Sequence, residues 1–309
     1  KLMSSPEFYY SISLKGTNLD HCYHISHVTS DQVWVSEYKN NLTLTNTAGE
    51  TLHHLKYPRS FHFDSSNGIH TVSSDGELLY MDNNNDIKKL SADLNFTTTF
   101  LETNNSNWQP LCVHYCQFTG DILVGTTRKK EIQTIDLEIN YIDEYENQGE
   151  LTSCKVTRYN KTGEETQTIQ FNNNRLQLYA LPLYITEYKN GDVVVSDNKD
   201  AVVVTDRGGK HRVTYTRHPS GSTISPRGVC TDSLSHILVV DVATQTIIMI
   251  NNDGHFLTYL LTNSQELHLI GCLSYDFLTS RLWVGSWKKN KVSVYRYIDR
   301  PDALTGKSD

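Results

Sequence analysis

Residues 191–206, which read GDVVVSDNKDAVVVTD, contain two runs of valine, at 193–195 and 202–204, with polar residues between them. Runs of β-branched residues favour strands, and short polar segments between such runs are typical of turns, so the stretch predicts a β-hairpin. The same arrangement recurs at 235–251, SHILVVDVATQTIIMIN, and at 281–295, RLWVGSWKKNKVSVY. This recurrence indicates a repeat protein in which each unit contains a hairpin of this kind.

A single valine near the end of an apolar strand marks each of six predicted repeats. These valines are Val35, Val72, Val124, Val195, Val239 and Val284. The steps between them are 37, 52, 71, 44 and 45 residues. Because a propeller blade spans about 40–50 residues, two steps are standard and two carry insertions. The short first step still leaves room for four brief strands.

Proline supplies a second marker of the repeat. Pro58, Pro110, Pro182 and Pro226 precede the local valine by 14, 14, 13 and 13 residues. Proline has no N–H to donate to a ladder of backbone hydrogen bonds, so it suits the place where a loop becomes a strand. Four of the seven prolines share this register, which supports the repeat independently of the valines.

Each repeat continues with a third strand and with a turn rich in Asn, Gly and Asp, residues that tolerate the positive φ of tight hairpins. Third strands are predicted at 42–45, 78–81, 156–159, 202–205, 247–250 and 292–295. A fourth strand follows in the first five repeats but not in the sixth. Residues 8–14, FYYSISL, form a strand without a partner of its own. Pairing this strand with 292–298 would complete the last blade and remove an exposed edge.

The pattern therefore predicts an all-β fold, a six-bladed β-propeller closed by an N-terminal strand that pairs into the last blade. We expect one domain over residues 8–298 with flexible ends at 1–7 and 299–309. Residues 128–153, which follow the second strand of the third repeat, are expected to form a long loop or hairpin on one face of the disc.

Composition narrows the class of protein. The chain has 309 residues, 38% of them hydrophobic, and a net charge of −7, which disfavours a non-specific polyanion binder. No run of about 18 apolar residues is present, so we expect no membrane association. Six cysteines without a CxxC pair do not suggest a disulfide framework, and we expect a reduced, cytoplasmic setting.

Two stretches resemble a known repeat. GDVVVSDNKDAVVVTDRGGK at 191–210 and SPRGVCTDSLSHILVVDVATQTIIMINNDGHF at 225–256 are similar to the NHL repeat, the propeller module at the C-terminus of many TRIM-type ubiquitin ligases. Trp34 and Trp283 stand where that pattern has smaller residues. The resemblance implies a non-enzymatic domain that recruits a protein or peptide substrate for an E3 ubiquitin ligase. It also implies a parent protein that oligomerises through a coiled coil absent from this stretch.

A rim of loops around the channel mouth is the predicted partner-binding surface. Arg59 and Arg227 occupy equivalent positions in repeats two and five, so they would face each other across the channel. The other predicted rim residues are Trp108, Gln109, Tyr179, His268, Tyr38, Lys39, Arg128, Lys129, Lys130, Asn198, Lys199, Trp287 and Lys288. Aromatic and arginine side chains make up most interface hot spots. In the alternative reading, the two arginines pair with nearby backbone or Asp groups and stabilise the repeat.

RNA is the alternative partner. Binding to phosphates requires a dense basic face, and the loops at 128–130 and 288–289 supply lysine and arginine. Asp75 and Asp241 occupy the corresponding places in repeats two and five. This mixture of charges favours a protein or peptide partner over RNA.

A metal-dependent, lactonase-like propeller enzyme is the second alternative. The segment DHCYHISH at 20–27 places Cys22 and His24 on one face of a strand, and His21 on the other, so no tetrahedral zinc set results. Elsewhere the innermost strands offer only Asp232, Asp276 and His114 as candidate ligands. We therefore predict no metal, no cofactor and no catalytic residue.

The cysteines on the innermost strands are expected to be small buried hydrophobic residues. Cys112 and Cys116 flank His114, but the alternation of a strand turns the imidazole to the opposite face. A catalytic thiol would need an exposed basic neighbour, which this spacing does not provide.

Overall fold

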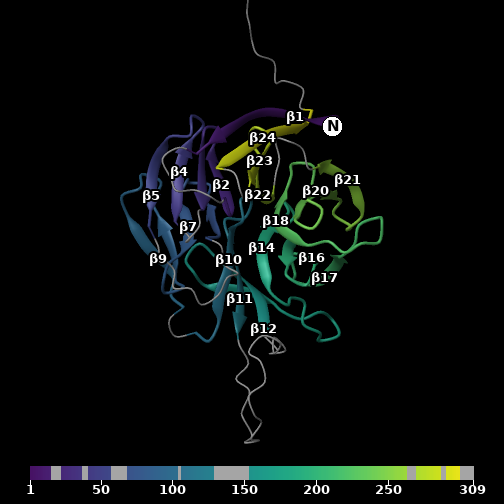
Figure 1. Cartoon of the computed structure of the whole chain (residues 1–309). Helices are drawn as coiled ribbons and strands as arrows, with labels where there is room; N and C mark the ends of the chain where they lie inside the picture. Colours follow the sequence, from purple (N-terminus) through teal and green to yellow (C-terminus); the bar gives the residue numbers. More distant parts are fainter. Residues whose placement is uncertain are drawn as a thin grey trace, which may run out of the picture.

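The structure is a computed structural model that describes residues 1–14, 22–36, 41–56, 68–103, 106–128, 153–262, 269–286 and 290–299. Within these residues the chain forms six four-stranded antiparallel sheets and no helix. The sheets are arranged radially about a central axis (Figure 1). The predicted all-β, six-bladed propeller is thereby confirmed.

Each blade has four strands in order from the axis to the rim. The innermost strands are β2 (His24–Thr29), β6 (His70–Val72), β10 (Gln109–Tyr115), β14 (Pro182–Glu187), β18 (Pro226–Thr231) and β22 (Ile270–Asp276). The second strands are β3 (Gln32–Ser36), β7 (Leu78–Met81), β11 (Ile122–Arg128), β15 (Val193–Asp197), β19 (Ile237–Asp241) and β23 (Arg281–Ser286). The third strands are β4 (Leu42–Asn46), β8 (Ile87–Leu90), β12 (Ser153–Tyr159), β16 (Ala201–Thr205), β20 (Thr246–Ile250) and β24 (Lys291–Ile298). The outermost strands are β5 (Thr51–Leu55), β9 (Thr97–Leu101), β13 (Glu165–Ile169), β17 (His211–Tyr215), β21 (Phe256–Leu261) and β1 (Leu2–Ser13).

The N-terminal strand closes the ring. β1 pairs antiparallel with β24, from Leu2 opposite Ile298 to Ser13 opposite Lys291. The predicted closure is confirmed, although the strand begins at Leu2 rather than at Phe8. Ile12 is fully buried in the core of the last blade, which ties the first residues of the chain to the last strand.

The second blade corrects the predicted register. Val72 lies on the innermost strand β6, and the segment 78–81, predicted as a third strand, is the second strand β7. Tyr80 pairs with His70 as Val35 pairs with Ile25, so tyrosine takes the place of the marker valine in this blade.

With Tyr80 in that place, the six markers are separated by 45, 44, 71, 44 and 45 residues, which is more regular than predicted. The valine of HTV at 70–72 precedes two serines and so imitates the marker. The long step contains residues 129–152, most of the predicted insertion, and these lie outside the described residues.

Burial on both faces of each sheet explains the continuous apolar runs. Val193, Val194 and Val195 on β15 are fully buried, because each blade packs between two neighbours. A strand covered on both sides needs no polar alternation. Pro110, Pro182 and Pro226 lie at the starts of β10, β14 and β18, as predicted, and a shift in strand register follows each of them. Pro58 lies outside the described residues.

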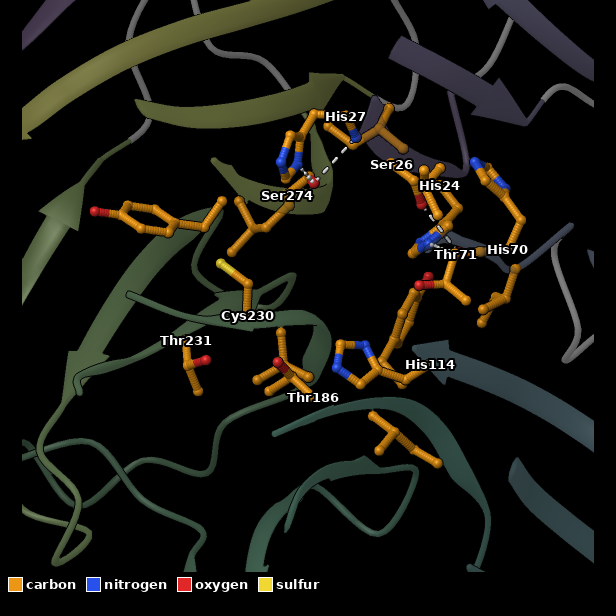
Figure 2. Close-up of a pocket in the computed structure, with 18 of the residues that line it drawn as sticks. His24, Ser26, His27, His70, Thr71, His114, Thr186, Cys230, Thr231 and Ser274 are labelled. Atoms are coloured by element: carbon orange, nitrogen blue, oxygen red, sulfur yellow. Dashed lines mark hydrogen bonds between the residues drawn. The ribbon is translucent and has the colours of Figure 1, made fainter. Parts of the chain in front are cut away.

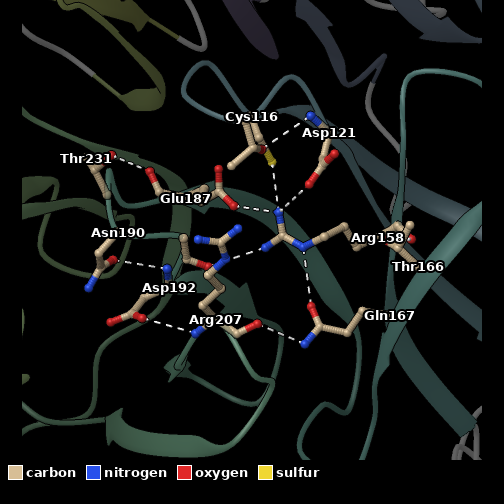
Figure 3. A network of polar contacts seen from close by, with 12 residues as sticks. Cys116, Asp121, Arg158, Thr166, Gln167, Glu187, Asn190, Asp192, Arg207 and Thr231 are labelled. Carbon is tan, nitrogen blue, oxygen red and sulfur yellow. Dashed lines mark hydrogen bonds and ion pairs between the residues drawn. The ribbon is translucent and has the colours of Figure 1, made fainter.

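A buried ion pair joins blades three and four (Figure 3). Arg158 Nη1 on β12 lies 2.6 Å from Glu187 Oε1 on β14 and 3.4 Å from Asp121 Oδ2. Arg158 Nη2 also donates to the carbonyl oxygen of Gly191 at 3.3 Å. The guanidinium therefore holds the third strand of one blade against the first strand of the next.

Candidate active site

Strand register places six side chains at one level around the propeller axis. In each blade, the marker residue on the second strand pairs with one residue of the innermost strand. The side chain at this level belongs to the next residue along the innermost strand. The six are Ser26, Thr71, His114, Thr186, Cys230 and Ser274. All of them line one cavity in the centre of the molecule (Figure 2). Hydroxyl, imidazole and thiol groups thus converge on the channel from all six blades.

The cavity has a volume of about 90 Å³. Aromatic side chains from opposite blades meet across the axis at two places. Phe118 of blade three contacts Phe277 of blade six with ring centroids 5.4 Å apart, and Tyr184 of blade four lies 5.7 Å from the ring of His24 in blade one. Such contacts narrow the channel, so the space between the blades admits a small group rather than a drug-sized ligand.

His24, which lines this cavity, has one ring nitrogen without a hydrogen-bond partner among the described residues. Its Nε2 atom lies 2.8 Å from the carbonyl oxygen of His70, which can only accept, so the proton is on Nε2. The Nδ1 atom then carries a lone pair, and it is buried without a hydrogen-bond partner among the described residues. Burial, reinforced by nearby His70, holds the pKa of His24 well below its usual range, so the ring is neutral at neutral pH.

His70 is fixed by the backbone, whereas His114 is not. His70 Nδ1 donates to the carbonyl oxygen of Gly68 at 2.8 Å, and its Nε2 lies 3.3 Å from the carbonyl oxygen of Trp34. No hydrogen bond joins His114 to another described residue, although it lines the cavity. Burial lowers the pKa of both imidazoles to about 4, and Arg158 contributes to the shift of His114.

A histidine and a serine from neighbouring blades form a close pair at the same cavity. His27 Nδ1 on β2 lies 2.8 Å from Ser274 Oγ on β22. On its other side, His27 Nε2 lies 4.0 Å from Asp276 Oδ1. Burial lowers the pKa of His27, and the negative charge of Asp276 partly opposes that shift.

The four histidines leave the cavity uncharged at neutral pH. His24, His27, His70 and His114 all have lowered pKa values, mainly because burial disfavours the imidazolium form. Their neighbours in the ring are four hydroxyl groups and the thiol of Cys230, whose pKa is raised by burial, and all of these are also neutral. The cavity therefore suits a small neutral ligand with hydrogen-bonding groups rather than a strongly charged one.

The donor set of the cavity does not fit a metal ion. Across the described ranges, no three His, Cys, Asp or Glu residues converge in a way that could hold one. His24 Nε2 and His70 Nδ1 are already committed to backbone carbonyl oxygens. All six cysteines lie in the described part of the chain, where they are buried and form no disulfide. Burial raises the pKa of Cys112, so its thiol stays protonated and is a poor ligand or nucleophile.

The predicted rim is only partly described. Trp108 lies under two cations of its own blade, with Arg128 at 5.2 Å and Lys155 at 4.7 Å from its ring centroid. Gln109 begins β10, and Asn198 and Lys199 are exposed in the turn after β15. The residues outside the described ranges are Arg59, His268, Tyr38, Lys39, Lys129, Lys130, Trp287 and Lys288. The rim as a binding surface stays a prediction.

The structure defines the surroundings of two residues of the predicted rim. Tyr179 is only 1% exposed, which corrects its placement, because the side chain belongs to the core and cannot meet a partner. Arg227 is partly buried on β18 and forms no ion pair with a described residue. The structure thus gives no support, in the part it describes, to a pairing of Arg227 with a neighbouring Asp.

Sequence reasoning missed the histidines of the cavity. The alternation at 112–116 did place His114 on the face opposite the buried cysteines, and the structure confirms that placement. The sequence signal that would have predicted the cavity is a polar residue at the same register in every innermost strand. That register becomes visible only when blade two is aligned through Tyr80.

The overall architecture matches that of known propeller enzymes. Virginiamycin B lyase from Staphylococcus aureus, in a catalytically inactive histidine-to-alanine form with quinupristin, superposes with a TM-score of 0.59 at 14% identity over 94% of this chain and 100% of that one. A streptogramin B lyase gives 0.57 at 15% identity, covering 94% and 98% of the two chains. A gluconolactonase from Xanthomonas campestris gives 0.61 at 12% identity, covering 96% and 95%. At this identity the likeness establishes the fold.

No protein-family model and no curated protein matches the chain. The NHL resemblance is therefore supported at the level of the six-bladed propeller, and not as an NHL or TRIM relationship. The expected non-enzymatic role in recruiting substrate for a ubiquitin ligase is contradicted, because the similar propellers named above are enzymes. In the described part of the chain, no helix has the length and apolar character to cross a membrane.

Proposed function

We propose that the chain is an enzyme that opens a small, neutral cyclic ester in the axial cavity, with histidine side chains transferring the protons. The observation that carries the proposal is the set of four neutral histidines from three blades around one cavity. His24 Nδ1 has no hydrogen-bond partner, and His114 forms no hydrogen bond with another residue in the described part of the chain.

Ester opening requires two kinds of group, and the cavity supplies both. A base must take the proton of the attacking nucleophile and return it to the leaving alkoxide, which is the usual role of imidazole. Donors must stabilise the oxyanion that forms on the carbonyl oxygen. Thr186 lines the cavity and forms no hydrogen bond with another described residue, so its hydroxyl is available to a substrate.

The environment of the cavity indicates the substrate class. A volume of about 90 Å³ and neutral walls favour a compact ring with hydroxyl or carbonyl groups over an ionic ligand. One of the similar folds supports this class by name, a gluconolactonase. The similar virginiamycin B lyase, whose histidine-to-alanine form is inactive, supports a role for histidine in such a propeller. Because the described donors do not fit a metal ion, no step of the proposed reaction is routed through one.

The test is a panel of small lactones, glucono-δ-lactone among them, with ring opening followed as acid release at constant pH. We expect the wild-type chain to open at least one of them, and at least one of His24→Ala, His27→Ala and His114→Ala to lower kcat by about 100-fold or more, the range of general acid–base catalysis. His255→Ala is the matched control, because His255 is exposed in a turn near the rim of blade five. Equal rates for the wild type and all three histidine variants would contradict the proposal.

A further inference from the structure

Resting on the proposed function, we propose that Ser274 is a catalytic nucleophile of this cavity, that His27 is its base, and that Asp276 positions and stabilises His27. The three residues come from two neighbouring blades, β2 of blade one and β22 of blade six. His27 and Ser274 are 247 positions apart in the sequence, so the closure of the ring brings them together.

The contacts of this pair are compatible with a serine hydroxyl that donates to the imidazole. Ser274 Oγ lies 2.8 Å from His27 Nδ1 and also accepts the main-chain N–H of His27 at 3.3 Å. The serine hydroxyl can accept that N–H and still donate its own hydrogen to Nδ1. The carboxylate of Asp276 on the Nε2 side favours the tautomer that carries its proton on Nε2. This is the protonation state in which histidine can accept the proton of a serine.

Asp276 is a fixed negative charge on the far side of the ring. Its carboxylate is 3% exposed. Oδ1 accepts the main-chain N–H of Leu278 at 2.8 Å and of Thr279 at 3.2 Å, and Oδ2 accepts the Thr279 hydroxyl. The distance of 4.0 Å to His27 Nε2 is too long for a hydrogen bond. At that distance the charge still stabilises the imidazolium that proton transfer would create.

Other hydroxyl groups on the innermost strands only form hydrogen bonds with backbone groups of a neighbouring blade. Ser26 donates to the carbonyl oxygen of His70, and Thr231 donates to the carbonyl oxygen of Glu187. Thr71 accepts the main-chain N–H of Tyr115. Each of these bonds joins neighbouring blades through backbone groups. Ser274 makes the same kind of bond to the His27 backbone and in addition contacts an imidazole, which the interblade bond does not require.

The pair is accessible from the cavity. Ser274 and His27 both line it, and the side chain of His27 is 21% exposed (Figure 2). The strand that carries Ser274 is the inner edge of its sheet. An edge strand has N–H groups without partners in the ladder, and these are the donors that a nearby oxyanion requires.

The reaction balances without a further reactant except water. Ser274 Oγ forms a bond to the ester carbonyl carbon while its proton moves to His27 Nδ1. When the tetrahedral intermediate collapses, the ring C–O bond breaks and the leaving alkoxide takes that proton from His27. Water then attacks the acyl-serine, gives its proton to His27, and the proton returns to Ser274 Oγ as the hydroxy acid leaves.

A fluorophosphonate probe tests the nucleophile directly, because such probes phosphonylate activated serine hydroxyls. We expect the intact wild-type chain to take up one probe molecule, with peptide mapping by mass spectrometry placing it on Ser274. Ser274→Ala and His27→Ala are expected to lose the label, and His255→Ala to keep it. Labelling at Ser26 or at a surface serine, or no labelling of the wild type, would overturn the proposal.

A second variant tests the nucleophile even if Ser274→Ala does not fold. Ser274→Cys keeps the size of the side chain, and its thiol beside His27 should react with iodoacetamide before the six buried native cysteines do. An unreactive Cys at this position in a folded protein would contradict activation by His27.

The lactone panel separates this inference from the proposed function. If lactones are opened and Ser274→Ala is as active as the wild type, the nucleophile is wrong and the proposed function stands. If no lactone is opened while Ser274 takes the probe, the substrate class is wrong and the nucleophile stands. For Asp276→Asn, we expect a lower kcat with KM unchanged, since the residue does not touch the substrate. An unchanged kcat in a folded variant would remove Asp276 from the arrangement.

Discussion

Arg158 and Glu187 show how single residues hold the blades in register. Their side chains are 8% and 1% exposed and lie on different blades, with a nitrogen–oxygen distance of 2.6 Å. Desolvating two charges is costly, and the cost is offset only while each keeps its partner. The pair therefore specifies which surfaces meet more than it adds net stability. The positive charge of Arg158 also helps to lower the pKa of His114.

Removing one partner should be far more costly than removing both. We expect Glu187→Leu to lower the free energy of unfolding by about 3–5 kcal/mol, because the buried guanidinium then keeps only the longer contact to the more exposed Asp121. Combining Glu187→Leu with Arg158→Met should recover part of that loss. Urea denaturation followed by tryptophan fluorescence measures both changes. The control is Glu77→Gln, since Glu77 and Lys89 form a half-exposed pair that contributes at most about 1 kcal/mol. A single variant as stable as the double would show that the pair carries no buried charge.

The N-terminal strand is the element on which closure depends. β1 supplies the outermost strand of a blade whose other three strands come from the end of the chain. Ile12 and Leu14 pack with Trp283 in the core shared by blades one and six. Without β1, the full length of β24 would be an unpaired edge, which is prone to pair with other chains.

Deleting residues 1–13 should lower Tm and cause aggregation, measured by differential scanning calorimetry and light scattering. A synthetic peptide of residues 1–14 added in excess should restore both, because it can occupy the vacated edge of β24. The same peptide with Ile12→Asp is the control, since a charge cannot enter the site of a fully buried isoleucine. Rescue by both peptides alike would rule out strand replacement.

The elements also show how far sequence reasoning extends. Valine runs and strand-opening prolines predicted the blades because propeller strands are buried on both faces and leave a continuous apolar signature. Blade two lacks this signature. Tyr80 replaces the marker valine on the second strand, and Val72 stands in a similar sequence context on the innermost strand. The cavity was not predictable in the same way. His24, His70 and Ser274 have no local pattern in common, and only the folded blades bring them to one cavity.

At the scale of the whole molecule, six similar innermost strands surround one cavity, and the side chains that they contribute differ from blade to blade. Virginiamycin B lyase and the gluconolactonase share the architecture at 14% and 12% identity. Fold alone does not decide the chemistry, which depends on the side chains at the axis. In this chain those side chains include four histidines, and burying them neutral makes the stability of the whole ring depend on pH.

The sign of that dependence follows from the lowered pKa values. Unfolded histidine titrates near pH 6.5, whereas His70 and His114 in the folded chain have pKa values of about 4. Between these values the unfolded state binds more protons, so stability is complete above about pH 6.5 and is lost as the pH falls toward 4. For fully buried His70 the shift corresponds to roughly 3 kcal/mol.

Urea denaturation at pH 7.5 and at pH 5 should therefore give a clearly lower free energy of unfolding at the acid pH. His114→Gln should narrow the difference, because glutamine cannot titrate and His114 has no hydrogen bond to lose within the described residues. His255→Gln should leave the difference unchanged, since that side chain is exposed in both states. Comparing the two variants separates the buried imidazoles from the carboxylates, which protonate over part of the same range but are identical in both proteins. A pH dependence that is the same for both variants would mean that His114 is solvated, and the cavity would then be too open to hold a neutral histidine base.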